Sequence, residues 1–152
     1  AQGGELWHEC QDRVLLAPPD RHLRVAGARL LLDDQPPRHS CRPSVDILFD
    51  SVASEVGSSV LACLLTGMGR DGATGLLAIQ RAGGQTIAQD EASSVVYGMP
   101  REAALLGAAQ KIIPLSSIPL AITDACGLSR GNAGNDRVVA NGNRASQKLR
   151  HE

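Results

Sequence analysis

The residues best suited to chemistry lie in one glycine-rich stretch, residues 64–75 (LLTGMGRDGATG). An apolar run, residues 60–65, leads into it, and a helix-like segment, residues 73–82, leads out. A strand therefore ends where a helix begins. In open α/β sheets, ligands and catalytic groups collect at the carboxyl ends of the strands. The carboxylate that needs an explanation is Asp71, which stands between two glycines of this turn.

Two interpretations follow from spacing alone. The pattern Gly67-x-Gly69-x-x-Gly72 matches a dinucleotide-binding fingerprint, and Asp90 follows about 20 residues later, where that fold places a ribose ligand. The carboxylate of Asp71 argues against this use, because it would compete with a pyrophosphate for the N–H groups at the start of the helix. The simpler interpretation makes Asp71 the N-cap of the helix that follows.

Five blocks of sequence, taken together and in order, resemble the CheB-type chemotaxis protein-glutamate methylesterases. The blocks are residues 17–23 (APPDRHL), 42–46 (RPSVD), 64–73 (LLTGMGRDGA), 88–93 (AQDEAS) and 97–103 (YGMPREA). The resemblance covers about residues 10–120, and ordered blocks are far more specific than one glycine pattern. It implies a cofactor-free enzyme of two-component signalling. Such enzymes hydrolyse glutamate methyl esters on the cytoplasmic domains of methyl-accepting chemoreceptors, releasing methanol, and some also deamidate glutamines.

The same resemblance assigns roles to residues. It implies a Ser-His-Asp mechanism in which Asp71 is the triad acid and the backbone N–H of Met68 stabilises the oxyanion. The nucleophile and base turns of the family, of Gly-Ala-Ser-Thr-Gly-Gly and Gln-His-Met-Pro type, occur nowhere in this chain. None of its histidines matches the family's base: His8, His22, His39 and His151. We therefore expect residues 1–126 to form a partial methylesterase catalytic domain that lacks its first strand–helix units and is inactive alone.

Further contacts are expected at the rim of the same cleft. Arg101 follows a proline at a helix start and Glu91 lies in a polar loop, so both are candidate substrate-binding residues, although an exposed helix start and a solvated loop are the simpler explanations. The family also implies a receiver domain as a partner, and no receiver-like segment occurs here. A non-catalytic remnant that binds receptors is the remaining alternative.

The elements that must position these residues follow from periodicity. Residues 22–25 and 28–32 predict a β-hairpin, and residues 13–17 predict a further strand. After residue 43, helices and strands alternate: helices 44–56, 73–82, 100–106 and 116–125, and strands 60–65, 86–88 and 111–115. The predicted fold class is therefore α/β, an open, mostly parallel sheet with helices on both faces in a Rossmann-like three-layer arrangement, plus a β-hairpin near the N-terminus. Residues 127–152 are expected to form a disordered polar tail.

Composition excludes several functions. The net charge of −1 and an aromatic content of 2% argue against nucleic-acid binding. No apolar run approaches a membrane span, so no membrane insertion is expected. The cysteines show no paired metal-ligand spacing, which predicts no metal site and fits a reducing, cytoplasmic location: Cys10, Cys41, Cys63 and Cys126.

Overall fold

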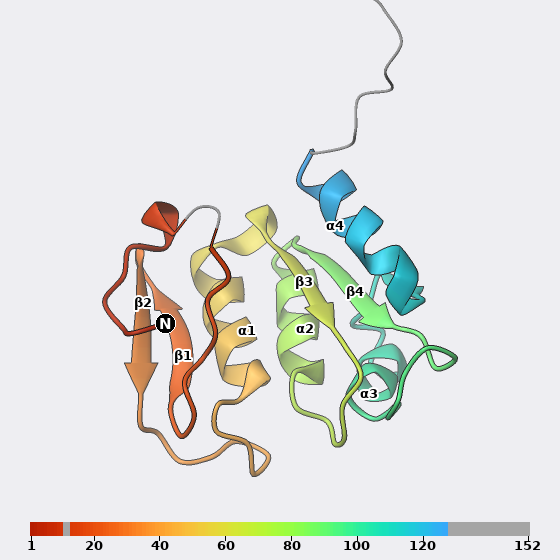
Figure 1. Ribbon diagram of the computed structural model, residues 1–152, viewed down its shortest axis with the longest axis horizontal. Helices are drawn as coiled ribbons and strands as arrows, with labels where there is room; N and C mark the ends of the chain where they lie inside the picture. Colours follow the sequence, from red (N-terminus) through yellow and green to blue (C-terminus); the bar gives the residue numbers. More distant parts are fainter. Residues whose placement is uncertain (11–12, 128–152) are drawn as a thin grey trace, which may run out of the picture.

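The computed structural model describes residues 1–10 and 13–127. It contains a small antiparallel hairpin, a parallel sheet, and helices packed between and beside them (Figure 1). In chain order the elements are the 3₁₀ turn Trp7–Glu9, β1 (His22–Ala26), β2 (Arg29–Asp33), α1 (Val45–Glu55), the 3₁₀ turn Gly57–Ser59, β3 (Leu61–Leu64), α2 (Ala73–Arg81), β4 (Gln85–Gln89), α3 (Met99–Leu105), β5 (Lys111–Ile113), the 3₁₀ turn Leu115–Ser117 and α4 (Ile118–Ala125).

The sheet has the order β3-β4-β5, and both strand pairs are parallel. Leu61 lies opposite Gln85, and Ile87 lies opposite Lys111. The strands β1 and β2 form a separate antiparallel pair. The predicted α/β class, with a parallel sheet and an N-terminal hairpin, is confirmed.

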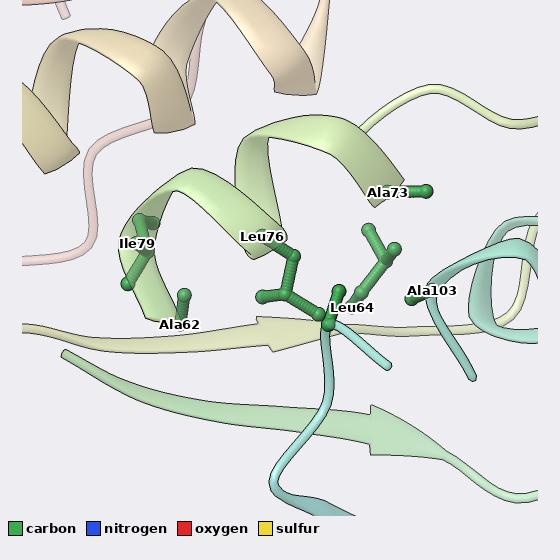
Figure 2. Packing of buried hydrophobic residues seen from close by; sticks show 7 residues of the cluster. Ala62, Leu64, Ala73, Leu76, Ile79 and Ala103 are labelled. Atoms are coloured by element: carbon green, nitrogen blue, oxygen red, sulfur yellow. The ribbon is translucent and has the colours of Figure 1, made fainter. Parts of the chain in front are cut away.

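The main core lies between α2 and the sheet. Figure 2 shows Leu76 and Ile79 directed from α2 toward β3, where Ala62 and Leu64 meet them. Both α2 side chains are fully buried, as helical spacing places them on one face of the helix. Ala103 of α3 closes the same cluster. This packing fixes the end of β3, and with it the start of the glycine-rich turn.

Helix α1 lies between the hairpin and α2 (Figure 1). Its Val52 packs against both hydrophobic clusters, that of the hairpin and that of the sheet. The helices α1 and α2 approach closely at Gly75, where an added Cβ would lie 2.6 Å from the Cβ of Phe49. A glycine inside a helix is costly by propensity, and at position 75, in the first turn of α2, it permits the contact between the two helices.

Three predictions about elements were wrong in detail. Residues 13–17 form no strand. Leu15 and Ala17 pack against the hairpin cluster while Val14 and Leu16 are exposed, so the segment alternates like a strand, but it pairs with none of the described strands. The strand predicted over 111–115 ends at Ile113, because Pro114 follows and has no N–H to donate. The last helix begins at Ile118, after a 3₁₀ turn.

Two further expectations concern the C-terminal tail and membrane-spanning helices. From residue 128 onward, the predicted tail lies outside the described residues. Among the helices of the described part of the chain, none has the length and apolar character needed to cross a bilayer.

Candidate functional site

The glycine-rich turn is held by the loop between β4 and α3. Thr66 donates its backbone N–H to Oε1 of Gln89 at 2.9 Å. Gly67 donates to the carbonyl of Val96 at 3.0 Å and accepts from the N–H of Met99 at 2.8 Å. Three of the sequence blocks therefore meet here: residues 64–73, 88–93 and 97–103.

Close packing makes glycine necessary in this turn and in the loop that holds it. An added Cβ at Gly98 would lie 2.6 Å from the carbonyl oxygen of Gly67 and 3.0 Å from the backbone nitrogen of Gly69. At Gly72 the backbone is left-handed, with φ of +86°, and an added Cβ would lie 2.7 Å from Leu64 and from Val45. Both the backbone angle and the space favour glycine at position 72. The turn is thus fixed by its neighbours.

The carboxylate of Asp71 is buried, with 3% of the residue exposed. Its Oδ1 accepts hydrogen bonds from the Ser44 hydroxyl at 2.6 Å and the backbone N–H of Asp46 at 3.1 Å. Its Oδ2 accepts from the backbone N–H of Val45 at 2.7 Å. Asp71 therefore caps the N-terminus of α1. The expectation that it caps the following helix was wrong, because the N-cap of α2 is Gly72 and carries no side-chain bond.

A second buried carboxylate, Asp46, belongs to α1 and binds the N-terminus of α2. Asp46 lies in the first turn of α1, is fully buried, and its Oδ1 accepts from the N–H of Gly75 in α2 at 2.6 Å. The adjacent N-termini of α1 and α2 each receive a carboxylate from the other's segment, where negative charge is favoured. Because the carboxylate of Asp46 occupies the start of α2, a dinucleotide pyrophosphate could not bind the N–H groups there.

Met68 is exposed at the tip of the turn. The exposed fraction of the residue is 86%, and no described residue accepts a hydrogen bond from its N–H. A free N–H at a strand-to-helix turn is the kind of donor that stabilises an oxyanion. The geometry is therefore compatible with the predicted role of Met68.

The histidines of the described residues do not supply a base to Asp71, and none hydrogen-bonds to it. His22 is fully buried; its Nδ1 accepts from the N–H of Ser44 at 3.1 Å, and its Nε2 lies 3.2 Å from the carbonyl of Pro36. Both ring nitrogens are thus used in the structure. The negative charge of Asp71 also acts on Cys41. Burial is the larger cause that raises the pKa of the Cys41 thiol, and the charge of Asp71 is the smaller one.

A hollow opens beside the turn. It is lined by His39, Ser40, Gly69, Arg70 and Glu102. An adjoining hollow adds Ala73, Thr74 and Leu106. The sequence alone gave no signal for this arrangement, because His39 and Arg70 are separated by a helix and a strand.

The two predicted substrate contacts do not line these hollows. Arg101 has an exposed side chain whose Nη1 lies 3.8 Å from Oε1 of Glu102. Glu91 is exposed in the loop after β4. Their contact with a substrate stays a prediction. The described residues also contain no group of side chains able to hold a metal ion.

Comparison with known proteins gives consistent matches. The family model described as CheB methylesterase matches residues 5–122. A protein-glutamate methylesterase/protein-glutamine glutaminase of Hahella chejuensis is 52% identical over 114 residues, covering 72% of this chain and 32% of that protein. One from Pseudomonas aeruginosa is 53% identical over 113 residues, with the same coverage of 72% and 32%. The chain spans about a third of the length of these relatives.

A solved structure also matches. The Thermotoga maritima CheB methylesterase catalytic domain superposes with a TM-score of 0.64 at 31% identity, over 70% of this chain and 57% of that one.

Proposed function

Because the chain belongs to the CheB methylesterase family, we propose that it carries the acid and oxyanion part of a protein-glutamate methylesterase site. In the proposed reaction a serine hydroxyl attacks the ester carbonyl while a histidine takes its proton. Asp71 holds that histidine in the correct tautomer, and the N–H of Met68 binds the oxyanion. Methanol leaves, and water then releases the glutamate from the acyl-enzyme.

The observation that carries this proposal is the state of the Asp71 carboxylate. It is buried and fixed by Ser44, Val45 and Asp46, so its position is set before any histidine arrives. An ionised carboxylate offers about four acceptor positions, two on each oxygen. Oδ1 accepts two described bonds, and Oδ2 accepts one. One acceptor position is thus left for an imidazole N–H.

The nucleophile and the base are not supplied by this turn. Ser44 touches Asp71, but it is buried at 2% exposure and its hydroxyl is engaged in a hydrogen bond to the carboxylate, so it does not serve as the nucleophile. We therefore propose that this polypeptide alone does not hydrolyse methyl esters. Without nucleophile and base, the loss of rate is on the order of a million-fold, by analogy with other hydrolase triads.

The proposed substrates are glutamate methyl esters on the cytoplasmic domains of methyl-accepting chemoreceptors, and the proposed location is the cytoplasm. A receiver domain is the proposed regulatory partner. Membership of the family supports these assignments. The relatives' names also include protein-glutamine glutaminase. We propose deamidation as a second activity, because the same oxyanion forms and ammonia replaces methanol as the leaving group.

The alternatives have less support. A dinucleotide-binding use of Gly67, Gly69 and Gly72 gains none from the geometry, since Asp46 occupies the start of α2. A non-catalytic receptor-binding remnant predicts that the residues of the turn do not affect hydrolysis when the rest of a site is supplied. The experiment below separates this remnant from the enzyme.

The test is a chimera in which residues 5–122 replace the matching segment of the Pseudomonas aeruginosa relative. Methanol release from methylated receptor is the measurement. We expect hydrolysis by the chimera and a fall in kcat of about 10⁴-fold with Asp71→Asn. The exposed Asp34→Asn is the matched control and keeps full activity. An Asp71→Asn chimera as active as its parent would refute the assignment.

A further inference from the structure

We propose that the hollow lined by His39, Ser40, Gly69, Arg70 and Glu102 is a specificity subsite, in which Arg70 binds a carboxylate side chain next to the ester on the substrate. The inference rests on the proposed function, because it takes the N–H of Met68 as the place of the reacting carbonyl. It adds a recognition residue and a preferred substrate chemistry to that site.

The position of Arg70 brings it near the substrate. It follows Met68 by two residues, a span of at most about 7 Å of chain. A peptide whose ester carbonyl lies at the N–H of Met68 therefore has its neighbouring residues beside Arg70. The Nε of Arg70 donates to Nδ1 of His39 at 3.2 Å, while its terminal nitrogens have no partner among the described residues. A guanidinium held at Nε presents a planar pair of donors suited to a carboxylate.

His39 holds Arg70 through an unusual backbone turn. His39 and Ser40 both have positive φ, 52° and 63°, in a tight turn closed by paired hydrogen bonds between Arg38 and Cys41. Positive φ is uncommon for residues other than glycine, and it clusters at functional positions. The turn directs His39 toward Arg70.

The tautomer of His39 follows from its contacts. Because Arg70 donates to Nδ1, the ring proton lies on Nε2, which is 3.2 Å from Oδ2 of Asp46, a buried oxygen that accepts no hydrogen bond from the described residues. The next charged group near this oxygen is Arg38, at 3.9 Å. The negative charge of Asp46 beside Nε2 favours this orientation of His39, and His39 orients Arg70 through their hydrogen bond. Asp46 and His39 are positioning residues, and Arg70 is the residue that contacts the substrate.

The charges around the hollow favour a carboxylate. Glu102 also lines it, but its carboxylate lies beside Arg101, which partly offsets its charge. Arg70 also lines the hollow, and it forms no ion pair with a carboxylate of the described residues. Since Glu102 still limits the negative charge that can enter, the subsite suits a single acidic side chain. Ala73 and Leu106 of the adjoining hollow provide an apolar surface for the stem of that side chain.

The test is a binding titration of the full chain, followed by NMR. Two synthetic peptides each carry one γ-methyl glutamate, flanked on both sides by glutamate in one peptide and by glutamine in the other. We expect about tenfold tighter binding of the glutamate peptide, in line with a charge-assisted hydrogen bond. Arg70→Gln removes this preference. Arg81→Gln, an exposed arginine at the other end of α2, retains it.

The role of His39 has its own readout. His39→Leu removes the acceptor for Arg70 and is expected to abolish the preference. His39→Gln keeps an acceptor and a donor and is expected to restore most of it. The Nε–H signal of Arg70 should move in the leucine variant and return toward its place in the glutamine variant.

Equal affinity for the two peptides, no binding of either, or a preference that survives Arg70→Gln would overturn the subsite. Binding is measured here without hydrolysis, so the two proposals fail separately. An active chimera without a charge preference rejects only the subsite. An inactive chimera whose chain still prefers the glutamate peptide rejects only the esterase assignment.

Discussion

At the scale of single residues, Asp71 has one structural task and one proposed catalytic task. Its three hydrogen bonds satisfy N–H groups at the start of α1 and the hydroxyl of Ser44. The proposed catalytic task is to orient a histidine. Since unpaired buried N–H groups are costly, the carboxylate contributes to folding whether or not catalysis takes place.

We therefore expect Asp71→Asn to lower the free energy of unfolding of the chain by about 1–3 kcal/mol. An amide NH₂ in place of Oδ2 would face the N–H of Val45, donor against donor. Urea denaturation at neutral pH is the measurement. Asp34→Asn alters only an exposed ion pair with Arg21 and should change stability by no more than about 0.5 kcal/mol. Equal losses in the two variants would contradict the capping role.

The sequence identified Asp71 but not its partners. The predicted helix over 44–56 begins as expected: Ser44 is the N-cap of α1, and its hydroxyl accepts from the N–H of Ile47 at 3.4 Å. Nothing in local spacing shows that a carboxylate 27 residues later reaches the same helix end. The reciprocal bond of Asp46 to Gly75 was missed for the same reason. Such contacts depend on how two helices pack, which periodicity does not encode.

At the scale of elements, periodicity and breakers predicted most of the secondary structure. The continuous apolar run before the turn became β3, and the helical spacing after it became α2. Failures occurred where pairing decides the outcome. Residues 13–17 have the alternation of a strand, yet a strand exists only where a neighbour supplies hydrogen bonds.

The contact between α1 and α2 gives an element-scale prediction. In an exposed helix, glycine to alanine stabilises by up to about 1 kcal/mol. At Gly75 the new Cβ would clash with Phe49, so we expect Gly75→Ala to destabilise the chain by about 1–3 kcal/mol. Thr74→Ala, at the neighbouring exposed position, should be neutral or slightly stabilising. Thermal melts of both variants test this, and a stabilised Gly75→Ala would show that the helices can separate without cost.

At the scale of the whole molecule, α1 joins two small hydrophobic clusters. The hairpin cluster contains Leu23, Val25 and Leu30, and Val52 contacts both it and the core of the sheet. Among the described strands, none pairs with the outer edge of β3. An unpaired edge is a site where another strand can add. The family fold was predictable from ordered blocks, whereas this division of the core was not, because it depends on which faces of α1 are covered.

We expect the two clusters to unfold together because they share α1. Fluorescence of Trp7, whose indole donates to the carbonyl of Gly27, reports the hairpin, and circular dichroism reports the helices. The two transitions should coincide. Val52→Ala should lower the free energy of unfolding by about 1–2 kcal/mol, so that both transitions move to lower denaturant concentration. The exposed Val14→Ala should move neither transition. Separate transitions for the two probes would mean that the hairpin is an independent unit.

The exchange of carboxylates between α1 and α2 has a consequence for how this protein can change. Catalytic groups often lie in arrangements that cost stability, so replacing them commonly makes an enzyme more robust. Asp71 is expected to behave in the opposite way, because the same oxygens hold α1 in place. A laboratory search for heat-resistant variants would therefore retain this aspartate even if no hydrolysis were selected. An aspartate at this position of a related sequence therefore indicates an intact fold, and it does not by itself indicate catalysis.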